Sequence, residues 1–260
     1  MTKDNRSISI ITLVFVIGAT IAANVLAFTT NMDTGDIANS TFDSTNYFFP
    51  ATYVFTTIWP VIYAAIVGWA IYQALPAHRD NPRFRTAAPW MIVNMVLNAV
   101  WVWVFGMQAF VATVVIIIPV LYTAVMVYRK LRVGEVRVGA WERAFQIGVT
   151  VYLAWLCVAT LANVASALIA AGWNGFGLSR EVWGLIMLLV GTGLAFLLYR
   201  GFNREVVIPL VFIYAYVGII ARYADEPLIL TGAILGAVAL AGLSFFHFRG
   251  GGRARALQPA

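Results

Sequence analysis

Residues 145–171 read FQIGVTVYLAWLCVATLANVASALIAA, a run of 27 residues without one charged side chain. A hydrocarbon core of ~30 Å takes about 20 helical residues to cross, and backbone amides in lipid must be hydrogen-bonded within the helix. The run therefore predicts a transmembrane helix. The whole chain agrees, because 62% of its 260 residues are hydrophobic and only 11% are charged, whereas soluble proteins average about 25% charged residues.

Seven further apolar runs flank this one, and all 28 charged side chains lie between or outside the runs. The pattern predicts an all-α integral membrane protein with eight transmembrane helices. The seventh run is short and has Pro209 near its start, and little more than Met107 separates the third from the fourth, which predicts a tight antiparallel turn. The predicted spans are 8–29, 51–75, 88–106, 108–128, 145–171, 182–199, 206–221 and 227–246.

The distribution of basic residues predicts the orientation. Fifteen of the 17 Lys and Arg residues fall in segments that share one side of the membrane, and only Arg180 and Arg222 fall on the other. Because cytoplasmic loops carry the excess of Lys and Arg, both termini are predicted to be cytoplasmic. This bias explains the net charge of +6 without a nucleic-acid partner, so membrane lipid is the expected surroundings.

The sequence excludes several classes of chemistry. No ionisable residue lies inside a predicted span, and proton relays and ion pumps need such groups at membrane depth. Cys157 is the only cysteine, so neither an intrachain disulfide nor a cysteine zinc cluster can form. His78 and His247 stand alone at helix ends, where we interpret them as interfacial residues rather than haem ligands. The lack of an acid, base or nucleophile constellation argues against a conventional hydrolase or transferase. We expect no metal site and no required cofactor.

Amides and aromatic rings at helical spacing follow one face of the second, third and fifth spans. Such stripes could line one ligand cavity, or they could be packing seams in which asparagines join helices, at about 0.6 kcal/mol each. Spacing alone leaves both readings open. The candidate ligand-binding residues are Phe55, Trp59 and Tyr63; Asn94, Asn98 and Trp101; and Tyr152, Trp155, Ala159 and Asn163.

Three segments, in order along the chain, carry a family resemblance: FFPATYVFTTIWPVIYAAIVGWAIY at 48–72, NMVLNAVWVWVF at 94–105 and YLAWLCVATLAN at 152–163. They resemble the TspO/MBR family of tryptophan-rich sensory proteins, which is related to the mitochondrial translocator protein. The resemblance covers roughly residues 8–170. It implies a five-helix bundle in a bacterial-type cell membrane, with a cavity that binds porphyrin, haem or another flat apolar molecule such as a sterol.

Carried over by position, the resemblance assigns the cavity rings to Trp59, Tyr63, Trp101 and Trp155, and the amides to Asn98 and Asn163. Ala159 matches the small residue that admits the ligand. Several family positions differ. A double proline is reduced to Pro50 followed by Ala51, and a Gly-Pro pair becomes Thr56-Thr57. The Pro-Pro pair after the tryptophan of the third span is replaced by Val102-Trp103, and a tryptophan near the start of the fourth span falls on Thr113.

The last three spans lie beyond the length of the short family members. We therefore predict a TspO-like core over residues 1–175 and an additional three-helix region over residues 176–260, which buttresses the core. Gly232 and Gly236 form G-x-x-x-G, and such small residues let helices approach closely in lipid. This face either packs within the monomer or forms a homodimer. The polar stretch from Asn31 to Asn46 could cover the mouth of a cavity or simply connect two helices.

Two functions fit these observations. The first is a sensory or regulatory receptor that binds a tetrapyrrole or a similar ligand, with slow light-dependent porphyrin degradation as an added activity. The second is transport of tetrapyrroles, sterols or other lipophilic metabolites. Alternating access generally uses broken helices or inverted repeats, and neither is evident in the sequence, so we favour the receptor.

Overall fold

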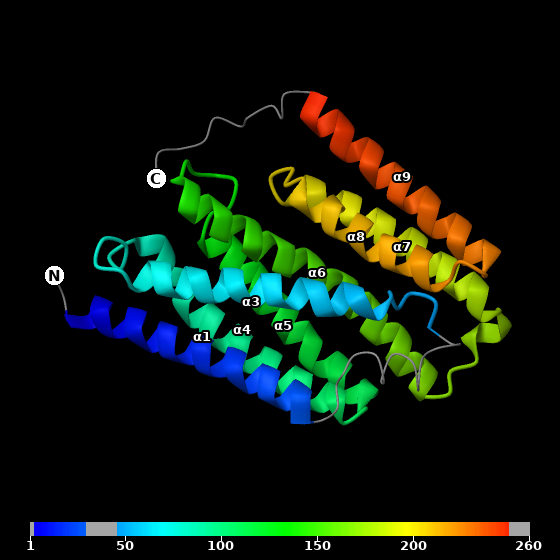
Figure 1. Cartoon of the computed structure of the whole chain (residues 1–260), viewed down its shortest axis with the longest axis horizontal. Helices are drawn as coiled ribbons and strands as arrows, with labels where there is room; N and C mark the ends of the chain where they lie inside the picture. Colours follow the sequence, from blue (N-terminus) through cyan, green and yellow to red (C-terminus); the bar gives the residue numbers. More distant parts are fainter. Residues whose placement is uncertain (1–2, 30–45, 250–260) are drawn as a thin grey trace. The chain divides into compact units, whose positions relative to one another are not determined.

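The structure is a computed structural model that describes residues 3–29 and 46–249 (Figure 1). Within these ranges it contains eight α-helices and one short 3₁₀ turn, η1 (Gly175–Gly177), and the described residues form no β-sheet. The all-α prediction is therefore confirmed. The helices are α1 (Lys3–Thr29), α3 (Thr52–Ala74), α4 (Pro82–Gly106), α5 (Phe110–Lys130), α6 (Ala140–Ala170), α7 (Arg180–Gly201), α8 (Val207–Arg222) and α9 (Pro227–Arg249).

Seven of these helices are long and apolar enough to cross a membrane. The eighth, α8, has 16 residues and is therefore about 24 Å long at 1.5 Å per residue, a few ångströms less than the ~30 Å core. The predicted short seventh span thus corresponds to the shortest helix. The predicted tight turn lies between α4 and α5, where Gln108 has φ = 58° and its amide donates to the Phe105 carbonyl.

The chain divides into two compact units, each of which is described by itself. The described part of the first contains residues 3–29 and 59–153, and that of the second contains residues 46–58 and 154–249. The boundary predicted after residue 175 stays a prediction. The segment 31–45, with Asp33, Asp36 and Asp43, and the C-terminal tail lie outside the described residues.

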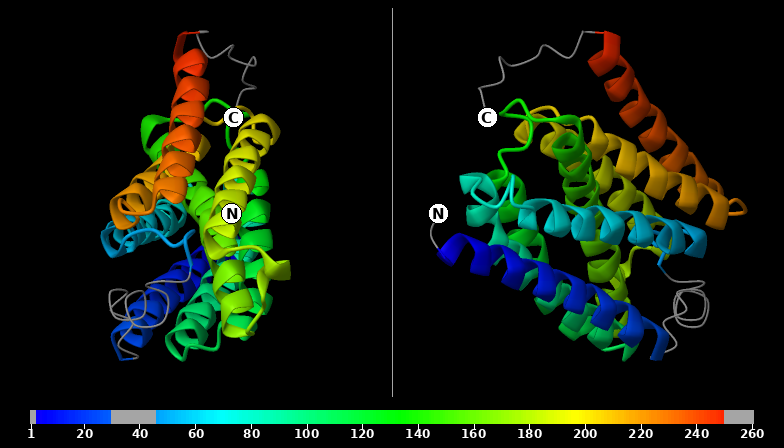
Figure 2. Two further views of the ribbon diagram at one scale, coloured as in Figure 1. Left: turned by 90° about the vertical axis from the view of Figure 1, so that its right-hand side faces the viewer. Right: turned by 60° about the vertical axis from the view of Figure 1, so that its left-hand side comes forward.

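In the first unit, α4 packs against both α1 and α5 (Figure 2). Helices α3 and α6 meet where a Cβ added to Gly148 would overlap the Cβ of Ala65. In the first turn of α6, Glu142 forms a largely buried ion pair with Arg83 on α4, with 2.5 Å between Nη1 and Oε1. A buried pair of this kind constrains geometry more than it adds stability.

In the second unit, α7, α8 and α9 pack against one another (Figure 1). Both glycines of the G-x-x-x-G motif lie at these contacts. A Cβ at Gly232 would lie 2.7 Å from Leu185, and one at Gly236 would lie 2.6 Å from the Tyr216 ring. The motif therefore packs within the chain, as one of the two sequence readings predicted.

A buried, non-helical segment precedes α3 in the second unit; we call residues 46–50 (NYFFP) the strap. Asn46 donates to the Ala162 carbonyl and to Ser166 on α6, and its own carbonyl accepts from the Tyr223 hydroxyl. Directly after the strap, the Ala51 amide donates to the Gly218 carbonyl of α8 at 3.1 Å. Helix α8 thus holds the start of α3 within the second unit, and the buttress role of the extra helices for the core stays a prediction.

Candidate functional site

The asparagines of α4 lie in the first unit, and each accepts a hydrogen bond from a tyrosine. Tyr152 donates to Asn94 Oδ1 at 2.8 Å, and Asn94 Nδ2 donates to the Val120 carbonyl and to Thr123 Oγ1. Asn94 is fully buried. Its amide therefore has a partner at both ends and ties α4 to α5 and α6, as expected of an asparagine that joins helices.

Asn98, one turn further along α4, is bonded at one end only. Tyr63 donates to its Oδ1 at 3.0 Å, but Nδ2 has no hydrogen-bond partner among the described residues although the side chain is 1% exposed. A buried donor without a partner costs about 1–3 kcal/mol. Asn98 therefore keeps an unused donor on the buried face of α4.

Aromatic rings lie next to this donor. Trp59 and Tyr63 stack with 5.3 Å between ring centroids, and Trp59 also lies 6.3 Å from the Tyr152 ring. Both Trp59 and Tyr63 remain partly exposed. We call Trp59, Tyr63, Asn94, Asn98 and Tyr152 the aromatic–amide cluster.

Trp101 lies on the same buried face of α4 as the two asparagines. It stacks on Phe105 with 5.0 Å between centroids and is 8% exposed. The predicted stripe from Asn94 to Phe105 is thus buried throughout.

Four candidate residues belong to the second unit. Phe55 stacks on Phe49 of the strap and meets the edge of Trp155, with centroids 4.9 Å and 5.2 Å apart. Trp155 is fully buried, and its indole Nε1 has no hydrogen-bond partner in the described part of the chain. Ala159 and Asn163 follow on α6 and are both buried.

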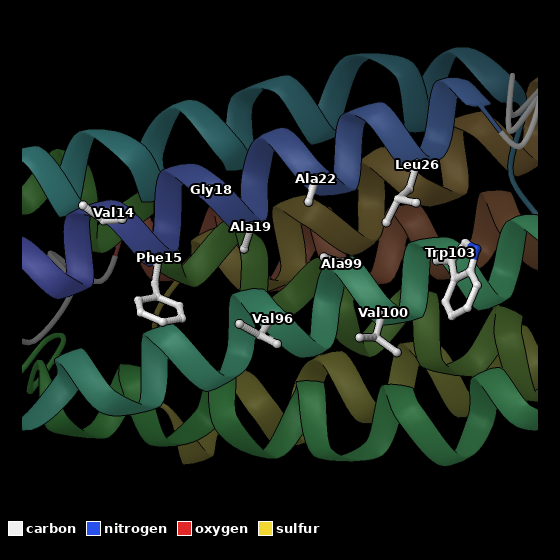
Figure 3. A pocket seen from close by; sticks show the side chains of 10 residues that line it. All are labelled: Val14, Phe15, Gly18, Ala19, Ala22, Leu26, Val96, Ala99, Val100 and Trp103. Atoms are coloured by element: carbon white, nitrogen blue, oxygen red, sulfur yellow. The ribbon is translucent and has the colours of Figure 1, made fainter.

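A pocket of about 360 Å³ lies between α1 and α4 (Figure 3). On α4 it is lined by Ala99 and Trp103, so it uses a neighbouring face to that of Asn98 and Trp101. Figure 3 shows Gly18, Ala19 and Ala22 of α1 opposite these residues. This groove is apolar and was not among the sequence predictions.

A comparison with family models shows to which family this chain belongs. The model described as TSPO-like protein matches residues 6–246. The chain belongs to the TSPO-like family. No curated protein and no solved structure matches the chain.

Membership of the TSPO-like family, together with the long apolar helices, identifies a multi-pass integral membrane protein. The match extends through α7, α8 and most of α9, well beyond residues 8–170, which the sequence resemblance covers. The three C-terminal helices thus belong to the family match.

Both histidines of this TSPO-like chain contact a tyrosine. His78 stacks on Tyr72, and His247 Nδ1 lies 2.9 Å from the Tyr199 hydroxyl. Cys157 is buried. Among the described residues, no group of three or more His, Cys, Asp or Glu side chains could hold a metal ion.

Sequence reasoning missed the partners that distinguish the two asparagines. Thr123 lies on the fourth predicted span, where a threonine gives no signal of its own. Asn24 also lies within a predicted span, the first, but it is exposed and donates to the Thr20 carbonyl one turn back. Such local bonding satisfies an amide without a second helix.

Proposed function

We propose that this TSPO-like protein is a sensory membrane protein that binds a flat apolar ligand of the porphyrin class at the aromatic–amide cluster. The observation that carries the proposal is the unused Nδ2 donor of Asn98 beside the stacked rings of Trp59 and Tyr63. Apolar pockets with a few well-placed polar groups are typical of small-molecule sites.

The roles of the cluster residues follow from their contacts. Trp59 and Tyr63 would offer a ring face to a flat ligand, and stacked aromatic pairs contribute about 0.5–1.5 kcal/mol beyond the buried area. Asn98 would donate to an acceptor atom of the ligand, while Asn94 and Tyr152 keep α4 and α6 in place. The six candidates in the first unit and the four in the second, including Trp155 with its unused indole donor, stay predictions as ligand contacts.

A binding titration tests the proposal. Protoporphyrin added to the detergent-purified protein should quench tryptophan fluorescence saturably. Replacing Asn98 by Ala should weaken the affinity by about tenfold or more, because loss of one buried hydrogen bond of 1.4 kcal/mol is a factor of ten. Trp59→Phe should weaken it as well, through a smaller ring face.

Matched controls are available in the same chain. Asn24→Ala removes an exposed amide, and Trp103→Phe alters an exposed ring in the α1–α4 groove. Both variants should bind like the unmodified protein. Unchanged affinity of Asn98→Ala, or equal loss in the Trp103 variant, would place the ligand elsewhere.

Two further activities are separable from binding. Illumination of the complex should bleach the porphyrin spectrum if the protein degrades its ligand, and should leave it unchanged in a pure receptor. Accumulation of porphyrin inside proteoliposomes would instead favour the transport alternative.

The proposed orientation places both termini in the cytoplasm, because the segments 76–87 and 129–144, with eight Lys and Arg residues between them, then lie inside. A single cysteine introduced at Arg137 in a Cys157→Ala background should react with an impermeant maleimide only after the cells are opened. Labelling in intact cells would reverse the orientation.

A further inference from the structure

The connection between α5 and α6 is a folded surface of the first unit. Leu131, Val133 and Val136 are 1%, 0% and 3% exposed. Backbone bonds fix the turn, since the Val133 amide donates to the Tyr128 carbonyl and Glu135 to the Arg132 carbonyl. We call residues 129–143, which contain five Lys and Arg residues, the basic platform; its buried Leu131, Val133 and Val136 anchor the connection.

Some charged residues of the basic platform form ion pairs and others do not. Both of its carboxylates form ion pairs with arginines. Glu135 pairs with Arg132 at 3.2 Å, and the buried Glu142 pairs with Arg83. Three cations remain exposed, and no carboxylate within residues 3–29 or 46–249 forms an ion pair with them. They are Arg129, Lys130 and Arg137.

A tryptophan accompanies these cations. Trp141, in the first turn of α6, is 74% exposed. Exposed tryptophans gather at the level of lipid headgroups, where one end of the ring is apolar and the other is wet. Its neighbour Glu142 is buried, so the exposed surface here combines an aromatic ring with positive charge.

We propose that the basic platform binds the headgroup of an anionic phospholipid through Arg129, Lys130 and Arg137, with Trp141 embedded beside it. Charge complementarity points to an anionic occupant, because Arg129 and Lys130 end α5, Arg137 lies in the connection that follows, and none of the three forms an ion pair within the described residues. A fixed platform loses less conformational entropy on binding than a flexible basic loop. The proposal is independent of the porphyrin site.

Native mass spectrometry of the delipidated protein tests this proposal. Phosphatidylglycerol and phosphatidylcholine with identical acyl chains would be titrated separately. We expect phosphatidylglycerol to bind at least about tenfold more tightly, since each cation near an anionic lipid surface contributes on the order of 1 kcal/mol. Equal retention of the two lipids would overturn the proposal.

The decisive comparison uses two variants of equal charge. Replacing Arg129, Lys130 and Arg137 together by Gln should remove the preference for phosphatidylglycerol. Replacing Arg200, Arg204 and Arg249 by Gln removes the same charge from the second unit and should leave the preference intact. Equal loss in both triple variants would mean that net charge alone attracts the lipid, and would refute a specific surface.

Two further arms complete the test. Trp141→Ala should weaken phosphatidylglycerol binding several-fold at unchanged net charge. Millimolar inorganic phosphate should not displace the lipid, and complete displacement would show a site for soluble phosphate instead. Thermal unfolding of each variant establishes that it is folded, and porphyrin affinity should stay unchanged in all of them.

Discussion

The hydroxyl of Tyr152 lies 2.8 Å from Asn94 Oδ1, whereas the amide of Asn98, one turn away on the same face of α4, keeps an unused donor. The two asparagines of α4 thus differ in their hydrogen bonding. Both ends of the Asn94 amide have protein partners, whereas Asn98 Nδ2 has none among the described residues. This difference leads to the first prediction.

Asn94→Ala should destabilise the protein more than Asn98→Ala. Three hydrogen bonds are lost at Asn94 and one at Asn98. At about 0.6 kcal/mol for each bond between membrane helices, the losses are about 2 and about 0.6 kcal/mol. Thermal or denaturant unfolding in detergent measures both. Equal losses would contradict the assignment of Asn94 as the structural amide.

Gly148→Ala should destabilise the contact between α3 and α6, because its new Cβ would overlap the Cβ of Ala65. Overpacking of this kind costs about 1–3 kcal/mol. The double variant Ala65→Gly, Gly148→Ala removes the overlap and should recover much of the loss. A double-mutant cycle without coupling would show that the two positions do not touch.

Gly218→Ala should loosen the strap. A Cβ at Gly218 would overlap Val54 and lie 2.9 Å from Pro50 Cβ. We expect a loss of about 1–3 kcal/mol and faster hydrogen exchange at the Ala51 amide, whose acceptor is the Gly218 carbonyl. Gly193→Ala is the control, since a Cβ there meets nothing within 4 Å. Equal effects of the two substitutions would show that helix α8 does not hold the strap.

Alkaline pH should weaken the anchoring of Tyr47. Burial, followed by the nearby carboxylates of Glu226 and Glu181, raises the pKa of its phenol above the usual 10.0. A raised pKa means that the folded state favours the neutral phenol, so its contribution is present below the unfolded pKa and lost as pH rises through the folded one. Stability should therefore fall above about pH 10.

Tyr47→Phe isolates this contribution from that of the other tyrosines. The variant should be less stable than the parent at neutral pH, and the difference should shrink as the pH rises past about 10. Melting temperatures recorded across this range measure the effect. A difference that grows with pH would have the wrong sign.

Apolar runs and charge placement were enough to predict the eight α-helices of residues 3–29 and 46–249, because a membrane span depends on local composition. The short α8 and the turn at Gln108 also followed from the sequence. The strap did not, since its burial depends on α6 and α8, which are far away in the chain.

Helical spacing placed Asn94 and Asn98 on one buried face, but it could not predict which of the two would have the more hydrogen-bond partners. That difference depends on Val120 and Thr123, which accept from Asn94 Nδ2 and whose positions are set by the packing of α4 on α5. The α1–α4 groove depends in the same way on how closely two helices approach. Charge counts likewise did not reveal that Glu142 turns inward and leaves the basic platform without that counter-charge.

The bond between the Ala51 amide and the Gly218 carbonyl also has a consequence for biosynthesis. Its acceptor leaves the ribosome roughly 170 residues after its donor, a delay on the order of 10–30 s at ordinary rates of translation. For that time Tyr47 and Phe48 of the strap lack their ring partners Tyr223 and Tyr216. The strap can therefore reach its final packing only after α8 has been made.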